Sequence, residues 1–267
     1  MATVAADLQG RAGAVKHEGS IRIMKLAPDH RKIPWLLLAL TALVFLLLGF
    51  GLARHLAGRP EAVVRAYHQW YHENGERTYN ATYWLGRPAQ KCPLDLWVMQ
   101  EIIHETRPDV IIETGTYKGG SAYYFASIQN LMDHGRVITI DIEDFPGKVE
   151  HPRITYLRGS SVAGSIVEQV RSMIRTGERV MVLLDSDHSR DHVLQELRLY
   201  SPLVTPGCYL VVEDTHFNGH PILPKFGPGP MEALEEFLRD NADFEIDRDR
   251  QKFGMSFNPS GYLKRSR

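Results

Sequence analysis

The chain has 267 residues, enough for one large domain and an appendage. Its hydrophobic content of 43% and charged content of 24% are those of an ordinary globular protein. The formal net charge is only −1, which gives no general electrostatic basis for a nucleic-acid partner, so we expect none. Cys92 and Cys208 are the only cysteines, too few for a disulfide framework.

Near the N-terminus, the stretch Ile33–Ala53 contains no charged side chain, and basic residues bracket it on both sides. A helix of this length, rising ~1.5 Å per residue, crosses a hydrocarbon core of ~30 Å. A cleaved signal peptide is the alternative, but its apolar region is usually only ~7–15 residues long. We therefore predict a transmembrane helix over residues 33–55 and a single-pass membrane protein.

The segments flanking this helix are predicted as follows. Residues 1–32 contain few aromatic and many small or charged residues, which is typical of disorder. The distribution of basic residues slightly favours an N-terminus in the cytoplasm, which would export the rest of the chain. The cofactor argued below is cytosolic, and on that ground we expect a cytoplasmic catalytic domain. Residues 60–92 are predicted to form a helix and linker, and 93–267 the catalytic domain.

From residue 93 onward, apolar runs alternate with segments of helical periodicity. The predicted strands are 109–113, 136–141, 153–158, 180–184 and 208–213. The predicted helices are 119–132, 162–175, 188–200 and 230–240. This alternation is typical of βαβ units, so we expect an α/β fold with a mostly parallel sheet. Two last apolar segments, near 244–247 and 256–263, have no helix between them and predict a terminal antiparallel pair.

A glycine-rich loop, Glu113-Thr-Gly-Thr-Tyr-Lys-Gly-Gly-Ser121, follows the first of these strands. Glycine lets the backbone turn sharply and approach a ligand, and the helix that begins there points free amide groups toward it. The spacing is not G-x-G-x-x-G. An acidic residue at the first turn is a poor neighbour for a pyrophosphate but suits the α-amino group of a methionine moiety. The loop therefore favours S-adenosylmethionine over NAD, although many such turns are glycine-rich for steric reasons alone.

Two further residues at strand ends are candidates for cofactor binding. Asp141 ends the second predicted strand, where a carboxylate can accept hydrogen bonds from ribose hydroxyls. Ser161 follows the third strand and could line an adenine pocket. The alternative for both residues is a structural role as a turn or helix cap.

Acidic residues follow two other strands: Asp185 comes after 180–184, and Glu213 and Asp214 come after the run 209–212. Carboxylate oxygens suit a hard cation such as Mg²⁺, so we predict these three as metal ligands, with Asp187 in reserve. Ordinary capping is the alternative, but three acids at adjacent strand ends would repel each other without a cation. His188 is the candidate base that removes a proton from the substrate hydroxyl.

Several motifs occur in the order that one known family shows: the loop 113–121, Ile140-Asp141, Leu184-Asp-Ser-Asp-His188 and Val212-Glu-Asp-Thr215. With them, the chain from about Tyr83 to Lys264 resembles the cephalosporin hydroxylase / rhamnosyl O-methyltransferase family of class I methyltransferases. The resemblance implies a Rossmann-like, seven-stranded sheet, S-adenosylmethionine as methyl donor and a Mg²⁺ site. No feature of the sequence indicates the iron site of a hydroxylase.

The chain is also similar, more remotely, to catechol O-methyltransferase, and this similarity implies roles for individual residues. The loop would bind the methionine part of the cofactor, Asp141 the ribose and Ser161 the adenine side. The implied loop residues are Glu113, Gly115, Tyr117 and Ser121, to which the loop's own chemistry adds Gly119. The implied metal ligands are Asp185, Glu213 and Asp214, the last in place of an amide. The catechol enzymes have a lysine as base where this chain has His188.

These observations predict a membrane-anchored, Mg²⁺-assisted O-methyltransferase in which His188 and Asp185 act on a hydroxyl of a sugar, glycolipid or small metabolite. The partners would be that substrate and the membrane, through Ile33–Ala53, with homo-oligomerisation left open. Two other functions remain as alternatives: an NAD-dependent oxidoreductase on the same kind of sheet, and a non-catalytic membrane scaffold.

Overall fold

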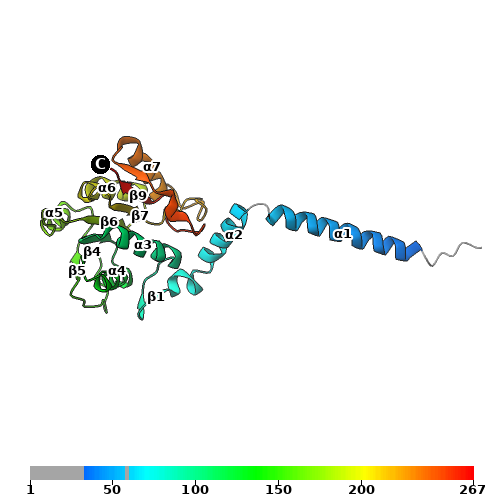
Figure 1. Cartoon of the computed structure of the whole chain (residues 1–267), viewed down its shortest axis with the longest axis horizontal. Coiled ribbons are helices and arrows are strands. Elements are labelled where there is room, and N and C mark those ends of the chain that lie inside the picture. Colours follow the sequence, from blue (N-terminus) through cyan, green and yellow to red (C-terminus); the bar gives the residue numbers. More distant parts are fainter. Residues whose placement is uncertain (1–32, 58–59) are drawn as a thin grey trace, which may run out of the picture. The chain divides into compact units, whose positions relative to one another are not determined.

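The computed structural model of the protein describes residues 33–57 and 60–267 (Figure 1). The segment 1–32, predicted to be disordered, lies outside the described residues. The chain divides into two compact units, with the boundary between His55 and Leu56.

The first unit contains helix α1, Ile33–Ala57, where the sequence predicts a membrane-spanning helix. Its segment Trp35–Arg54 is long and apolar enough to cross a bilayer, and none of its residues is buried. A signal sequence near an N-terminus would pass the same test of length and composition. The hydroxyl of Thr41 donates to the carbonyl of Leu37 at 2.8 Å, so this polar group is satisfied within the helix, as a lipid environment requires.

The second unit is built on a seven-stranded sheet with the order β5-β4-β3-β6-β7-β9-β8. Strands β3 to β7 run parallel to one another, while β9 runs antiparallel to both of its neighbours. The predicted α/β class, the seven strands and the terminal antiparallel pair are confirmed. The strands are β3 Val110–Thr114, β4 Arg136–Asp141, β5 Ile154–Arg158, β6 Val180–Leu184, β7 Tyr209–Val212, β8 Phe244–Ile246 and β9 Tyr262–Arg265.

Helices cover both faces of this sheet. Alternate side chains of a strand point to opposite faces, so each face has its own apolar core. Val110 and Ile112 of β3 belong to one core cluster, and Ile111 between them belongs to the other. The first cluster includes side chains of α5, α6 and α7, and the second those of α3 and α4. The helices are α3 Pro93–Thr106, α4 Gly120–Leu131, α5 Gly164–Ser172, α6 Arg190–Tyr200 and α7 Pro230–Asp240. Short 3₁₀ turns occur at η3 Ser201–Leu203 and η4 Arg248–Gln251.

Residues 60–92, predicted as a helix and linker, form part of this second unit. They comprise α2 Pro60–Glu73, the 3₁₀ turns η1 Gly75–Arg77 and η2 Tyr79–Ala81, and a small hairpin of β1 Tyr83–Trp84 with β2 Arg87–Pro88. Tyr71 of α2 is buried in a third apolar cluster with Cys92, Met255 and Phe257. This segment is therefore tied to the C-terminal part of the domain.

The order of the strands reverses at β3, which pairs with β4 on one side and with β6 on the other. In open α/β sheets, ligands bind beyond the carboxyl ends of the strands at such a switch point. The glycine-rich loop follows β3, Asp185 follows β6, and Glu213 and Asp214 follow β7. The fold thus brings the predicted site residues to one edge of the sheet.

A buried carboxylate fastens α3 to the C-terminal segment of the domain. Asp95, in the first turn of α3, accepts hydrogen bonds from the Ser256 hydroxyl at 2.6 Å, the Phe257 amide at 2.8 Å and the Tyr262 hydroxyl at 2.7 Å. Burial raises the pKa of Asp95, and these three donors oppose that rise by favouring the ionised form.

Replacing this carboxylate should therefore destabilise the domain. We expect Asp95→Ala to cost at least about 3 kcal/mol, because each buried donor left without an acceptor costs ~1–3 kcal/mol. In thermal unfolding of the full chain in detergent, the midpoint should fall by roughly 6–12 °C. Asp249→Ala is a matched control on an exposed residue and should shift it by no more than about 2 °C. Equal shifts for the two variants would contradict the assigned role of Asp95.

Candidate active site

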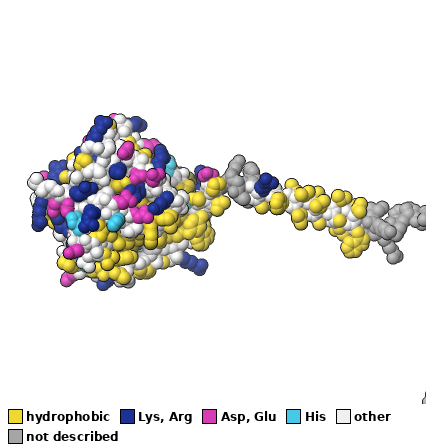
Figure 2. Space-filling model, viewed as in Figure 1, with side chains coloured by type: hydrophobic (Ala, Val, Ile, Leu, Met, Phe, Trp, Pro, Cys, Tyr) yellow, Lys and Arg dark blue, Asp and Glu magenta, His cyan; other side chains and the backbone are white. Residues whose placement is uncertain are grey.

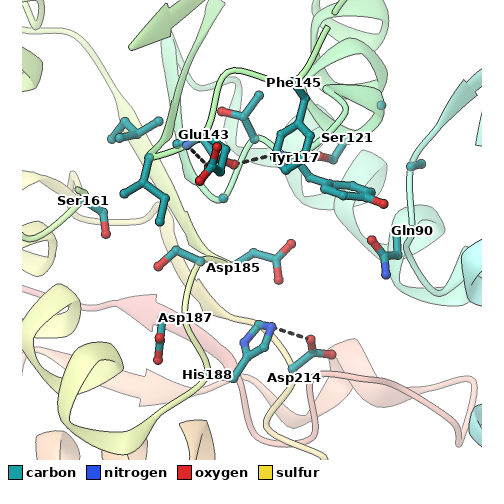
Figure 3. Close-up of a pocket in the computed structure, with 18 of the residues that line it drawn as sticks. Gln90, Tyr117, Ser121, Glu143, Phe145, Ser161, Asp185, Asp187, His188 and Asp214 are labelled. Carbon is teal, nitrogen blue, oxygen red and sulfur yellow. Dashed lines mark hydrogen bonds and ion pairs between the residues drawn. The ribbon is translucent and has the colours of Figure 1, made fainter. Parts of the chain in front are cut away.

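A cavity of 760 Å³ opens at the switch point of the sheet, within the usual size of a small-molecule site. Figure 3 shows Tyr117 and Glu143 on one side of it, Asp185, His188 and Asp214 on the opposite side, and Ser161 and Gln90 at its two ends. Five of the seven predicted cofactor residues line this cavity: Gly115, Tyr117, Ser121, Asp141 and Ser161.

Two glycines allow the loop after β3 to pack as closely as it does. At Gly115, where φ is +87°, an added Cβ would lie only 1.8 Å from the carbonyl oxygen of Asp185. At Gly120, the first residue of α4, it would lie 2.1 Å from the carbonyl oxygen of Pro88. No side chain fits at either place, so glycine is required for the loop to lie against β6 and the hairpin.

Glu113 and Gly119, the other two predicted cofactor residues, do not line the cavity. Glu113 is fully buried beneath the loop, and burial raises its pKa to about 7, although nearby Lys91 counteracts the rise. Its carboxylate accepts a hydrogen bond from the Thr139 hydroxyl at 2.6 Å. Because a hydroxyl has a single proton, Thr139 must accept in its 2.7 Å contact with the Thr116 hydroxyl. Hydrogen bonds from Glu113 through Thr139 to Thr116 thus hold Thr116, a residue of the loop, in place.

Asp141, at the end of β4, is held by two backbone amides. One carboxylate oxygen accepts from the amide of Tyr117 at 2.7 Å and the other from that of Glu143 at 2.8 Å. Each oxygen keeps a second lone pair for a ligand in the cavity. Tyr117 has a φ of +46°, which is uncommon for a residue with a side chain, so this hydrogen bond also stabilises a strained turn.

Ser161 lies after β5 and is tied to α6. Its hydroxyl is 3.1 Å from Nε2 of His192, which is also 3.1 Å from the Ser186 hydroxyl. Ser186 in turn donates to the buried carboxylate of Glu196 at 2.7 Å. The Glu196 carboxylate raises the pKa of His192. His192 and Ser186 line the cavity too, although sequence reasoning gave them no part in the site.

At the ends of β6 and β7, three side chains converge on one point of the cavity wall. One ligand atom each of Asp185, His188 and Asp214 lies within 4.8 Å of the other two. His188 Nε2 is 3.2 Å from a carboxylate oxygen of Asp214, the contact drawn in Figure 3. Asp187, the reserve ligand, lines the cavity outside this group, and its carboxylate accepts the amide of Ser189 at 2.7 Å at the start of α6.

Glu213, a predicted metal ligand, faces a different partner. The ammonium group of Lys91 forms ion pairs with both Glu213 and Asp185, and all three groups are largely shielded from water. The two carboxylates raise the pKa of Lys91 despite its burial. Burial raises the pKa of Glu213 well above its ordinary value, because one ammonium group cannot neutralise two buried carboxylates. Sequence reasoning missed Lys91, since a single lysine in a polar segment carries no pattern.

Asp214 is held by two histidines and by a strained turn. Burial alone would raise its pKa, but His188 and His216 hold it at about 2. Nε2 of His216 lies 3.1 Å from Asp214, and its Nδ1 lies 2.7 Å from Nε2 of His68 on α2. Asp214 has a φ of +55°, and its amide donates to the side chain of Asn258 at 3.1 Å. A chain of polar contacts therefore runs from α2 to the cavity.

Comparison with known proteins shows the family of this chain. Residues 76–266 match the model of the family described as Rhamnosyl O-methyltransferase/CmcI. The chain belongs to this family. The resemblance noted from its motifs is thereby confirmed.

Relatives of known activity agree with this placement. The rhamnosyl O-methyltransferase of Mycobacterium leprae (strain TN) is 40% identical over 214 residues, covering 78% of this chain and 93% of that one. Its counterpart in Mycobacterium tuberculosis (strain ATCC 25618 / H37Rv) is 39% identical over 222 residues, covering 80% and 90%. A CmcI structure with Mg and SAM superimposes with a TM-score of 0.55 at 21% identity, over 70% of this chain and 78% of that one, which supports the fold.

The protein is thus an S-adenosylmethionine-dependent O-methyltransferase. This decides against both alternatives left open by the sequence, the NAD-dependent oxidoreductase and the scaffold without activity.

The buried ion pairs of Lys91 make a prediction about this methyltransferase that is independent of its substrate. We expect Lys91→Met to cost about 3–5 kcal/mol, because the variant leaves Asp185 and Glu213 buried without a counter-charge. Its unfolding midpoint in detergent should fall by roughly 6–20 °C. Lys252→Met removes a largely exposed ion pair with Glu101 and an exposed contact with the Phe253 ring, and it should cost less than about 1 kcal/mol. An unchanged midpoint for Lys91→Met would show that the ion pairs do not stabilise the fold.

Proposed function

We propose that this membrane-anchored enzyme transfers a methyl group to a sugar hydroxyl with the help of a divalent cation held by Asp185 and Asp214. The observation that carries the proposal is the position of Asp185, His188 and Asp214 in the wall of the same cavity that the glycine-rich loop borders. A methyl donor on the loop and a hydroxyl beside the acidic group would then be neighbours.

The cavity offers distinct surfaces for the parts of S-adenosylmethionine, which supplies the methyl group on a positively charged sulfur. The amide-rich start of α4 and the Ser121 hydroxyl suit the methionine carboxylate and amino groups. Asp141 suits the ribose hydroxyls, and Ser161 with His192 suits the adenine side. In this proposal Glu113 positions the loop through Thr139 and Thr116 rather than touching the cofactor.

The residues present fit a divalent cation. Asp185 and Asp214 offer carboxylate oxygens from rigid strand ends, and His188 offers a nitrogen within reach of the same point. Mg²⁺ prefers oxygen ligands and keeps several waters, whereas an imidazole ligand also suits Mn²⁺. When bound, such an ion lowers the pKa of a coordinated hydroxyl and offsets its developing negative charge. Glu213 would not contact the ion. It would hold the ammonium group of Lys91 beside Asp185.

His188 has two possible roles, and its contacts define them. As a base, it would accept the proton of the acceptor hydroxyl, with Asp214 orienting the ring from 3.2 Å. As a ligand, it would complete the metal group with Asp185 and Asp214. Its ring packs at nearly a right angle to that of Phe217, at a centroid distance of 5.3 Å, and this contact helps to hold the ring at the cavity wall in either role.

Three observations support the proposed sugar acceptor and the membrane anchor. Aromatic side chains that suit the apolar face of a sugar ring line the part of the cavity near Asp214, namely Tyr79, Phe217 and Phe257. The two mycobacterial relatives are named rhamnosyl O-methyltransferases, after a sugar group. The apolar helix α1 supports attachment to a membrane.

The metal role predicts a specific loss. Asp185→Asn should abolish the stimulation of methyl transfer by Mg²⁺, because the amide removes one charged ligand. The dissociation constant of S-adenosylmethionine, measured by calorimetry, should change little, since only the side chain changes and the carboxylate of Asp185 pairs with Lys91 and lies near Asp214. Labelled methyl donor and a glycolipid extract provide the activity assay.

Asp187→Asn is the matched control, because Asp187 lines the same cavity outside the metal group. It should keep its Mg²⁺ response. Full activity of the wild type in excess chelator, or of Asp185→Asn without metal, would refute the metal role.

The two roles of His188 separate in kinetics. If it is the base, His188→Gln should lower kcat by about 10²–10⁴-fold at neutral pH and leave the half-saturating Mg²⁺ concentration unchanged. If it is a ligand, activity should return as Mg²⁺ is raised. His104→Gln, on the exposed side of α3, should change neither quantity. Unaltered kinetics for His188→Gln would exclude both roles.

A further inference from the structure

The domain covers only part of the apolar surface of helix α2. Its inner side buries His68 and Tyr71 against the domain. On the adjoining side, Val63, Tyr67 and Trp70 are 57%, 48% and 53% exposed. Their spacing of four and three residues places them in one stripe along the helix. The rings of Tyr67 and Trp70 stack at a centroid distance of 5.9 Å. We call these three side chains the outer stripe.

Polar side chains bound the outer stripe. Arg65 and Gln69 are exposed on the side of the helix away from it, and Glu73 is exposed at the end of the helix. Figure 2 shows hydrophobic side chains gathered at the part of the domain where α2 lies. Another exposed aromatic residue, Phe253, adjoins Gly254, where an added Cβ would lie 3.4 Å from Val64 of α2. The ammonium of Lys252 lies 5.4 Å from the centre of the Phe253 ring.

Covalent geometry restricts what can cover this surface. Helix α1 ends at Ala57 and α2 begins at Pro60. Three Cα–Cα steps of about 3.8 Å keep these two residues within about 11 Å of each other, whatever the angle between the helices. If α1 spans a bilayer, the start of α2 must therefore lie in or next to the headgroup layer of that bilayer, which is ~5–8 Å thick.

The chemistry of the outer stripe agrees with that place. Tyrosine and tryptophan are enriched where hydrocarbon meets headgroups, because each has an apolar body and a polar tip. A stable pair of protein copies usually buries about 800 Å² on each partner, and three half-exposed side chains provide only part of that area. A lipid surface has no such minimum, since binding grows with every apolar group inserted.

We propose that the outer stripe of α2 is a membrane-docking surface that inserts into the headgroup layer of the bilayer spanned by α1. This inference rests on the anchor proposed above. The inner side of the same helix reaches the active site, since His72 lines the cavity and His68 contacts His216 beside Asp214. Docking by α2 therefore holds the cavity at a fixed height above the lipid surface, within reach of an acceptor displayed there.

Spin labels on the full chain test this directly. Both native cysteines are buried, so a cysteine introduced on α2 is the reactive one. Tyr67→Cys lies in the outer stripe, and Gln69→Cys is the matched control on the polar side. The labelled protein is reconstituted in vesicles of phosphatidylcholine and phosphatidylglycerol. Relaxation of the label by oxygen, which is enriched in lipid, is compared with relaxation by a water-soluble nickel chelate.

The label at 67 should be relaxed several-fold more by oxygen than by nickel, and the label at 69 the reverse. Trp70→Cys provides a second site in the outer stripe if the first variant folds poorly. Equal exposure of 67 and 69 to nickel would overturn the proposal. So would shielding of 67 from both reagents with spin–spin broadening, which would indicate a second copy of the chain.

Extraction of the same vesicles with alkaline carbonate separates this proposal from the anchor. Retention of the protein with a water-exposed label at 67 would overturn the docking surface and leave the anchor in place. Release of the protein would contradict the anchor, and the label at 67 would still report whether α2 contacts lipid.

Discussion

Three carboxylates lie at the ends of two neighbouring strands, almost out of water, and this concentration of negative charge needs positive partners. The structure supplies them from outside the sheet: Lys91 pairs with Asp185 and Glu213, while His188 and His216 lie beside Asp214. The imidazoles carry a charge only when protonated, so these partners do not offset three buried carboxylates at every pH, and this is the physical basis of the proposed cation site. The proposed metal role and the stability of the fold would then depend on the same balance of charge.

The partners of the acidic group also explain why the segment before the catalytic sheet belongs to the domain. Lys91 follows the hairpin, and His68 comes from α2, so both parts of residues 60–92 reach the site. The hairpin further packs on the start of α4, where only Gly120 fits beside Pro88. The loop that borders the cavity is consequently held from three directions: by β6, by the hairpin and by the Glu113 hydrogen-bond chain.

The fold was largely predictable because buried parallel strands are continuous apolar runs, and β4, β6 and α7 begin and end where the pattern indicated. For the same reason the sequence indicated that Asp185, Asp214, Asp141 and Ser161 lie at the cavity, since each lies at the end of a strand or within three residues after it. What the sequence could not provide was the direction of a side chain. Glu213 and Asp214 are adjacent, yet one faces Lys91 and the other the cavity, and Glu113 lies beneath its loop. Lys91 and His192 depend on contacts between distant segments, which no local pattern records.

The most direct test of this account is a crystal structure of the full chain in lipid with Mn²⁺, in place of Mg²⁺, and the demethylated cofactor. We expect an anomalous manganese peak in contact with both Asp185 and Asp214, and cofactor density with its ribose at Asp141. A manganese peak elsewhere, or a cofactor bound away from the loop at residues 113–121, would contradict it.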